Sequence, residues 1–196
     1  MDLPPPKIEK PVTPPPTEKA ADTKTAETKT PDKAPETKPA TAQNDLKPGD
    51  NPKRVYQLRE LEHGTVVAGR NKIDTWLMDD DGKQEEGMMF LTDKDVKDNQ
   101  GMLFVSADAQ SRSFWMQNTL IPLDIVYIAA DGKVINMVHG KPRDETLLPS
   151  TAPSKYVLEL KDGRASRFGI APGTKLTIPP NASYKGAPPS SGMPPG

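Results

Sequence analysis

The segment from Phe114 to Asp124, which reads Phe-Trp-Met-Gln-Asn-Thr-Leu-Ile-Pro-Leu-Asp, is the densest group of unusual side chains in the chain. An exposed Trp115 would offer a flat apolar face, and Gln117 and Asn118 would add amide donors and acceptors. This combination suits a sugar ring or another neutral polar ligand. The alternative is that Asn118 and Asp124 only close a turn by hydrogen bonding to the backbone.

Strand alternation would give this segment two distinct faces. If Phe114 and Met116 point into the core, Trp115 and Gln117 share the opposite face. We therefore predict a ligand-binding surface that combines this segment with the loop at residues 139–143. Its candidate residues are Trp115, Gln117, Asn118, Thr119, Asp124, His139 and Arg143.

Two acidic residues lie in apolar strand sequence. Asp124 begins an apolar run, where burial would suit it to proton transfer, so it is the candidate catalytic residue. Glu159 lies between Leu158 and Leu160, and two strand-borne acids could form a general acid and base pair of the glycosidase type. Alternation argues against that pair, because it directs Glu159 away from the two leucines and toward solvent.

Metal and nucleophile chemistry find little support in the sequence. The chain has no cysteine, and the spacing of its two histidines, His63 and His139, predicts no zinc site. Methionines together with His139 could hold a cuprous ion, but methionine more often fills gaps in a small core. The Asp-Asp-Asp-Gly run at 79–82 lacks the further ligands of a calcium loop. We therefore expect no metal and no cofactor.

Strands must position most of these residues. The clearest unit is residues 124–138, where two runs rich in β-branched residues flank Asp131-Gly132 and predict a tight hairpin. Further strands are predicted within residues 70–79, 101–106, 113–116, 155–160 and 175–178, and short helices within 84–90 and 164–168. The fold class is mostly β, a β-rich α+β domain forming a single small barrel or sandwich with one or two short helices.

Proline divides the chain into three parts. Most of the 23 prolines among the 196 residues lie near the two ends, whereas nearly all aromatic residues lie between them. We predict a disordered linker rich in Pro, Thr, Lys and Ala over residues 1–54, a β-rich domain over 55–180, and a disordered Pro/Gly/Ser tail over 181–196. The middle part is long enough to bury one core.

Charge and hydropathy limit the partners and the location. With 26 basic and 27 acidic residues, the chain has no basic footprint for nucleic acid, and no apolar run could span a bilayer. No export signal follows Met1. A proline-rich spacer nevertheless suits a periplasmic, secreted or envelope protein whose signal has been removed; the alternative is a cytoplasmic location. We expect a monomer.

The segment beginning at Phe114 resembles the signature of a family of uncharacterised bacterial and archaeal proteins, the domain of unknown function 192. The signature residues present here are Phe114, Trp115, Met116, Asn118, Thr119, Pro122, Leu123 and Asp124. Further similar segments are Gly87-Met88-Met89-Phe90, Gly101-Met102-Leu103-Phe104, Tyr156-Val157-Leu158-Glu159 with Gly163, and Gly169-Ile170 with Gly173. The resemblance covers roughly residues 70–178.

The chain departs from the family pattern at one place. The family usually has an arginine shortly before its Gly-Leu-Met-Phe, where this chain has Gln84-Glu85-Glu86. This departure argues against an anionic ligand held there.

The resemblance implies a compact β-rich domain, frequently behind an export signal, with no established reaction. Our first hypothesis is therefore a non-enzymatic accessory or binding domain of the cell envelope, whose partner is a neutral polar or glycan-like ligand or an envelope component. The second is a small hydrolase that uses Asp124 as general acid or base. The third is a purely structural domain with no small-molecule site.

Overall fold

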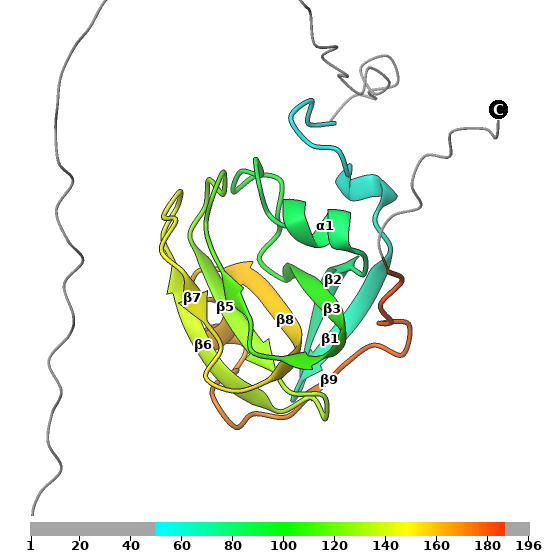
Figure 1. Cartoon of the computed structure of the whole chain (residues 1–196), viewed down its shortest axis with the longest axis vertical. Coiled ribbons are helices and arrows are strands. Elements are labelled where there is room, and N and C mark those ends of the chain that lie inside the picture. Colours follow the sequence, from blue (N-terminus) through cyan, green and yellow to red (C-terminus); the bar gives the residue numbers. More distant parts are fainter. Residues whose placement is uncertain (1–49, 187–196) are drawn as a thin grey trace, which may run out of the picture. The chain divides into compact units, whose positions relative to one another are not determined.

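The computed structural model describes residues 50–186, and these form a mostly β domain with two short α-helices, as predicted (Figure 1). The remaining parts of the expected linker and tail lie outside the described residues. The strands are β1 (His63–Ala68), β2 (Asn71–Met78), β3 (Gln100–Gln110), β4 (Ser113–Phe114), β5 (Leu123–Ile128), β6 (Val134–Gly140), β7 (Leu148–Pro149), β8 (Ser154–Lys161) and β9 (Leu176–Thr177). The helices are the 3₁₀ turn η1 (Leu58–Glu60), α1 (Asp81–Glu86) and α2 (Arg164–Arg167). None of the helices in the described part of the chain is long and apolar enough to cross a membrane.

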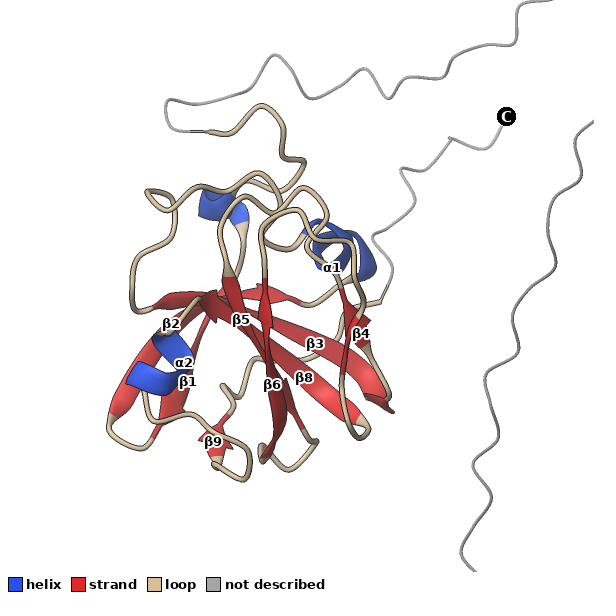
Figure 2. Ribbon diagram, turned by 90° about the vertical axis from the view of Figure 1, so that its left-hand side faces the viewer, coloured by secondary structure: helices blue, strands red, loops and turns tan. Residues whose placement is uncertain are grey.

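Seven strands form one curled sheet in the order β6-β5-β8-β3-β2-β1-β9, whose strands are labelled in Figure 2. Strands β4 and β7 form a second, two-stranded sheet. Only the β2–β3 pair of the large sheet is parallel. At one end the two sheet edges meet, because Val134 N donates to Thr174 O at 2.8 Å and Leu176 N donates to Gly132 O at 2.9 Å. The sheet is therefore a partly closed barrel.

The central strands of this sheet, β5, β8 and the first half of β3, are buried on both faces. One face carries an apolar cluster with members from all seven strands, among them Val66, Val126 and Leu158. The other face carries a second cluster, including Phe104 and Tyr127, which packs under the loops and the segment after α1. Because both faces of these strands are covered, successive side chains point alternately into the two apolar clusters, and neither face is a solvent-exposed one.

The predicted hairpin is present as β5 and β6. Its turn is wider than two residues, since Gly132 N donates to Ala129 O and Ala129 N donates to Lys133 O. Gly132 has a φ of +87°, which a residue with a side chain rarely adopts. The Asp-Gly pair thus marks the turn correctly, and its glycine supplies the left-handed residue that follows a β-turn.

The helix predicted within 84–90 forms earlier, from Asp81 to Glu86. It begins there because the Asp80 carboxylate caps it, accepting a hydrogen bond from Lys83 N at 2.9 Å. It ends there because Gly87 leaves helical geometry with a φ of +45°. This end of the helix lies over the second cluster and forms one wall of the cavity described next.

Candidate functional site

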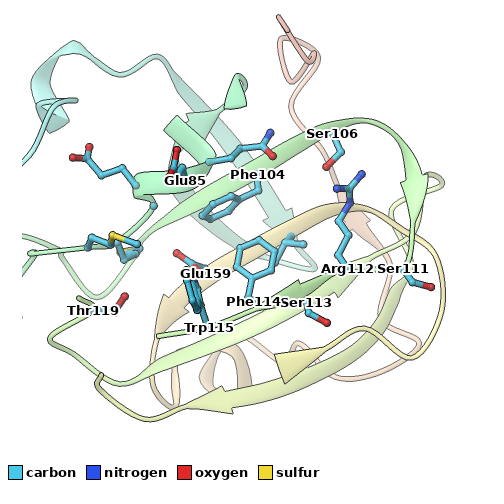
Figure 3. A pocket seen from close by; sticks show the side chains of 16 residues that line it. Glu85, Phe104, Ser106, Ser111, Arg112, Ser113, Phe114, Trp115, Thr119 and Glu159 are labelled. Carbon is cyan, nitrogen blue, oxygen red and sulfur yellow. The ribbon is translucent and has the colours of Figure 1, made fainter. Parts of the chain in front are cut away.

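A cavity of about 370 Å³ opens between the end of α1 and strands β3, β4 and β8 (Figure 3). At its centre lie the side chains of Phe104, Phe114, Trp115 and Glu159, with Arg112 and Ser106 toward one end and Thr119 toward the other. The full lining is Gln84, Glu85, Glu86, Gly87, Met88, Met89, Phe104, Ser106, Ser111, Arg112, Ser113, Phe114, Trp115, Thr119, Val157 and Glu159.

The Glu159 carboxyl group is the principal polar group in the interior of this cavity. Glu159 is 4% exposed, and its Oε2 atom has no hydrogen-bond partner among residues 50–186. Burial raises its pKa to about 8, against the smaller opposing effects of the Arg54 charge and of a hydrogen bond from the Met88 backbone. At neutral pH this carboxyl group is therefore mostly protonated and can donate a hydrogen bond to a ligand.

The sequence-based expectation that Glu159 faces solvent is wrong. Alternation itself holds, because Glu159 points away from the face that carries Leu158 and Leu160. The error lies in what covers the other face: Gly87 and Met88 lie over Glu159, and Met102 is its cross-strand neighbour. This covering comes from a segment about 70 residues earlier in the chain, so the sequence around Glu159 carries no signal for it.

Arg54 fixes the segment over the cavity. Its guanidinium is buried, and Nη1 donates to the Gly87 and Met89 carbonyls at 2.9 and 2.6 Å. Its Nη2 atom lies 3.1 Å from Glu86 Oε2. The same glutamate accepts hydrogen bonds from the backbone N–H groups of Val55 and Tyr56. Arg54, which the sequence analysis places at the end of the linker, thus lies beside the segment Gly87-Met88-Met89-Phe90. In the sequence, no arginine stands immediately before that segment.

The apolar wall of the cavity is aromatic. Trp115 is 46% exposed, so much of its indole is available to a ligand. The Phe104 and Phe114 rings pack edge to face with centroids 4.9 Å apart, and Phe114 contacts the buried Tyr127 ring at 6.1 Å. Such pairs hold ring orientation firmly. The half-exposed indole therefore stands beside a preformed aromatic wall.

The cationic group of the lining is already engaged by protein. Arg112 Nε donates to Ser154 O at 3.2 Å and Nη2 donates to Asp108 O at 3.0 Å, with the Asp108 carboxylate 3.5 Å away. Two further acidic side chains line the cavity, those of Glu85 and Glu86, and Glu86 is paired with Arg54. The lining therefore offers no free cation to an anionic ligand.

The structure brings together only two of the predicted surface residues in this cavity, Trp115 and the buried Thr119. Gln117 and Asn118 do not line it. Asn118 adopts a left-handed turn with a φ of +55°, and its carbonyl accepts a hydrogen bond from Phe90 N at 3.0 Å. Asn118 thus lies in a turn, and its side-chain Nδ2 donates to Met89 Sδ at 3.9 Å.

Asp124, His139 and Arg143 lie outside the cavity lining. Asp124 is fully buried, and its Oδ2 atom accepts a hydrogen bond from Ala165 N at 2.9 Å. Its other oxygen, Oδ1, lies 2.8 Å from His139 Nδ1. Arg143 is exposed and contributes its backbone N–H to Thr119 O at 3.0 Å.

The strand register separates the two acids. Asp124 pairs with Leu160, and Glu159 pairs with Ile125. Leu160 and Ile125 belong to the two different apolar clusters, on opposite faces of the sheet. Asp124 and Glu159 therefore cannot flank one substrate bond as a glycosidase pair does.

Residues 64–178 match the sequence profile of the domain of unknown function 192, described as an uncharacterized ACR. The chain belongs to this family. The match includes the whole segment on which the resemblance rests, from Phe114 to Asp124. It also includes every residue that lines the cavity, whereas Arg54 precedes the matched region.

Two solved structures resemble this member of the domain of unknown function 192. One is a candidate transcription regulator from Sinorhizobium meliloti 1021, 29% identical, with a TM-score of 0.56 over 60% of this chain and 95% of that chain. The other is a protein of unknown function from Novosphingobium aromaticivorans DSM 12444, 34% identical, with a TM-score of 0.54 over 70% and 96% of the two chains. No curated protein has a significantly similar sequence. The family is thus one of uncharacterised function.

Proposed function

We propose that this domain binds a small, neutral, ring-shaped polar ligand of the sugar type in the cavity beside Trp115. The observation that carries the proposal is the Oε2 atom of Glu159, which has no hydrogen-bond partner among residues 50–186 and is buried next to a half-exposed indole. Ligand sites typically combine an apolar wall with a few fixed polar groups, and this cavity has both. Its volume lies within the range of small-molecule sites.

The protonation state of Glu159 supports a neutral ligand. A protonated carboxyl group donates one hydrogen bond and accepts another, which matches the hydroxyl groups of a sugar. An anion would find no free cation in the lining, because Arg112 is already held by Asp108 and Ser154, and it would meet the Glu85 carboxylate. The indole face of Trp115 would cover the apolar C–H face of the ring.

An accessory binding role in the cell envelope completes this proposal. It rests on the proline-rich composition of residues 1–54, which suits a spacer between the domain and a surface. Fractionation of cells that make the native protein tests the location. Recovery of the intact chain, beginning at Met1, from the cytosol would contradict it.

The hydrolase alternative receives no support from this geometry. Asp124 lies outside the cavity lining, on the sheet face opposite Glu159. Its Oδ2 atom is occupied by the Ala165 N–H. We therefore assign Asp124 no part in the proposed ligand site.

A titration followed by NMR tests the proposal on the full chain. The probes are glucose, N-acetylglucosamine and glucuronic acid, which compare neutral sugars with an anionic one. The chain has two indole N–H groups, those of Trp115 and of Trp76, which is 4% exposed. We expect a neutral sugar to shift the Trp115 signal and leave the Trp76 signal in place, and we expect glucuronic acid to bind more weakly.

Matched variants complete the experiment. Trp115→Ala should weaken binding at least about tenfold, or 1.4 kcal/mol. Leu147→Ala should leave binding unchanged, because Leu147 is another exposed apolar residue, 63% exposed, outside the cavity lining. Equal binding by the Trp115→Ala variant, or no shift of the Trp115 signal with either neutral sugar, would overturn the proposal.

A further inference from the structure

Three side chains that could bind a metal ion meet at one end of the sheet, away from the cavity lining. Asp124 comes from β5, His139 from β6, and Asp162 directly follows β8. Asp124 and His139 are direct cross-strand partners. Asp162 continues the neighbouring ladder, since its N–H donates to Pro122 O at 3.0 Å. Three adjacent strands therefore place one possible ligand each at the same position.

The ligand atoms are close together. His139 Nδ1 lies 2.8 Å from Asp124 Oδ1 and 3.1 Å from Asp162 Oδ1, and the three ligand atoms all lie within 4.8 Å of one another. Two ligands that are each about 2.1 Å from an ion stand about 3.0–3.4 Å apart at bond angles of 90–109°. The two contacts of His139 are close to that spacing.

Asp124 supplies an independent indication of a missing partner. It is fully buried, yet its Oδ1 atom has no properly oriented hydrogen-bond donor within residues 50–186. The imidazole Nδ1 carries at most one hydrogen, and its geometry favours Asp162. The carboxylates of Asp124 and Asp162 therefore share a single possible N–H donor, His139 Nδ1. Its hydrogen points to Asp162, so the buried Asp124 carboxylate receives no hydrogen bond from it. A buried carboxylate in this position is stabilised by a cation.

We propose that Asp124, His139 and Asp162 bind one divalent cation of the zinc class. The imidazole nitrogen selects against calcium and magnesium, which prefer oxygen ligands. The ion would replace the Nδ1 proton of His139 between the two carboxylates. Ala165 N, which holds Asp124 Oδ2, fixes the orientation of this first ligand.

The neighbouring cations do not occupy the cluster. Lys161 lies 2.8 Å from Asp93 and 3.0 Å from Asp98, and Arg164 lies 3.0 Å from Asp98. His139 and Asp162 are exposed, so the ion would be reached from solvent and would keep an open coordination position for water.

Calorimetric titration of the full chain with zinc chloride tests this site, with calcium chloride as the comparison. We expect one zinc ion per chain and weaker calcium binding. His139→Asn and Asp162→Asn should each weaken zinc binding at least about tenfold. Both side chains are exposed, so these variants should keep the wild-type fold and unfolding midpoint without metal, unlike a change at the buried Asp124.

The matched control is His63→Asn. His63 Nδ1 lies 2.9 Å from Asp74 Oδ1, an arrangement like that of His139 but without the buried second carboxylate. This variant should bind zinc as the wild type does. Absence of saturable zinc binding, tighter binding of calcium than of zinc, or wild-type affinity in the His139→Asn variant would overturn the proposal.

Discussion

Gly87 lies directly over Glu159: a Cβ atom on Gly87 would stand 3.6 Å from Glu159 Oε2 and 3.1 Å from Phe104 Cζ. The close approach of this backbone seals the carboxyl group from solvent on one side. It also leaves the cavity as the open side. The raised pKa of Glu159 and the polar interior of the cavity thus have one structural cause.

Replacing Gly87 by alanine should therefore destabilise the domain. Its φ of +45° is unfavourable for any residue with a side chain, and the new methyl group would press on Phe104. We expect a loss of about 1–3 kcal/mol in the free energy of unfolding, measured by urea denaturation. Gly163→Ala is the control, because Gly163 also has a positive φ of +75° but nothing lies within 4 Å of its Cβ position. That variant should lose about 1 kcal/mol. Equal losses in the free energy of unfolding for the two variants would show that contact with Phe104 does not add to the destabilisation.

The buried carboxyl group also predicts a pH dependence of stability. The pKa of Glu159 is raised from 4.5 to about 8 in the folded chain, so between these values the folded state holds a proton that the unfolded state has released. Stability from this group must then fall as pH rises from 4.5 to 8, by at most about 1.4 kcal/mol per pH unit, and level off above 8.

Glu159→Gln isolates this contribution, since glutamine does not titrate. The stability of the variant relative to the wild type should increase from pH 5 to pH 8, as measured by urea unfolding at each pH. A difference that stays constant over this range would mean that Glu159 titrates alike in the folded and unfolded states.

The contacts of Arg54 predict that the stability of the domain depends on a residue that precedes the family match. Arg54→Met removes donors to the Gly87 and Met89 carbonyls and leaves Glu86 without its cation. We expect a loss of about 2–4 kcal/mol, read from thermal or urea unfolding. Lys175→Met is the control, because Lys175 pairs with Asp131 and both side chains are more than half exposed, which is worth at most about 1 kcal/mol. If both variants unfold alike, Arg54 does not anchor the segment over the cavity.

Much of the fold could be predicted because the residues that form each element are close together in the sequence. The β5–β6 hairpin follows from two β-branched runs around Asp131-Gly132, and Trp115 stands exposed as alternation with Met116 suggests. β1 was not predicted, since His63–Ala68 has no strong alternation, and the strand predicted within 113–116 ends at Phe114.

The site residues that sequence reasoning missed depend on contacts between distant segments. The burial of Glu159 needs the chain after α1, and Arg54 reaches that chain from over 30 residues away. Asp162 joins Asp124 and His139 only through the register of a third strand, whereas Asp124 and His139 both belong to the predicted surface and pair across the predicted hairpin. Spacing along the chain carries no signal for the burial of Glu159, the reach of Arg54 or the position of Asp162. Hydrophobic alternation indicates which face a residue occupies, but not what covers that face.

Titration of the Glu159 carboxyl group itself, followed through its ¹³C chemical shift in the full chain and assigned with the Glu159→Gln variant, tests the proposed site most directly. We expect a midpoint near pH 8, because the group is buried between the aromatic wall and the Gly87 backbone. A midpoint near the ordinary value of 4.5 would contradict it, since the cavity would then contain a solvated carboxylate instead of a hydrogen-bond donor.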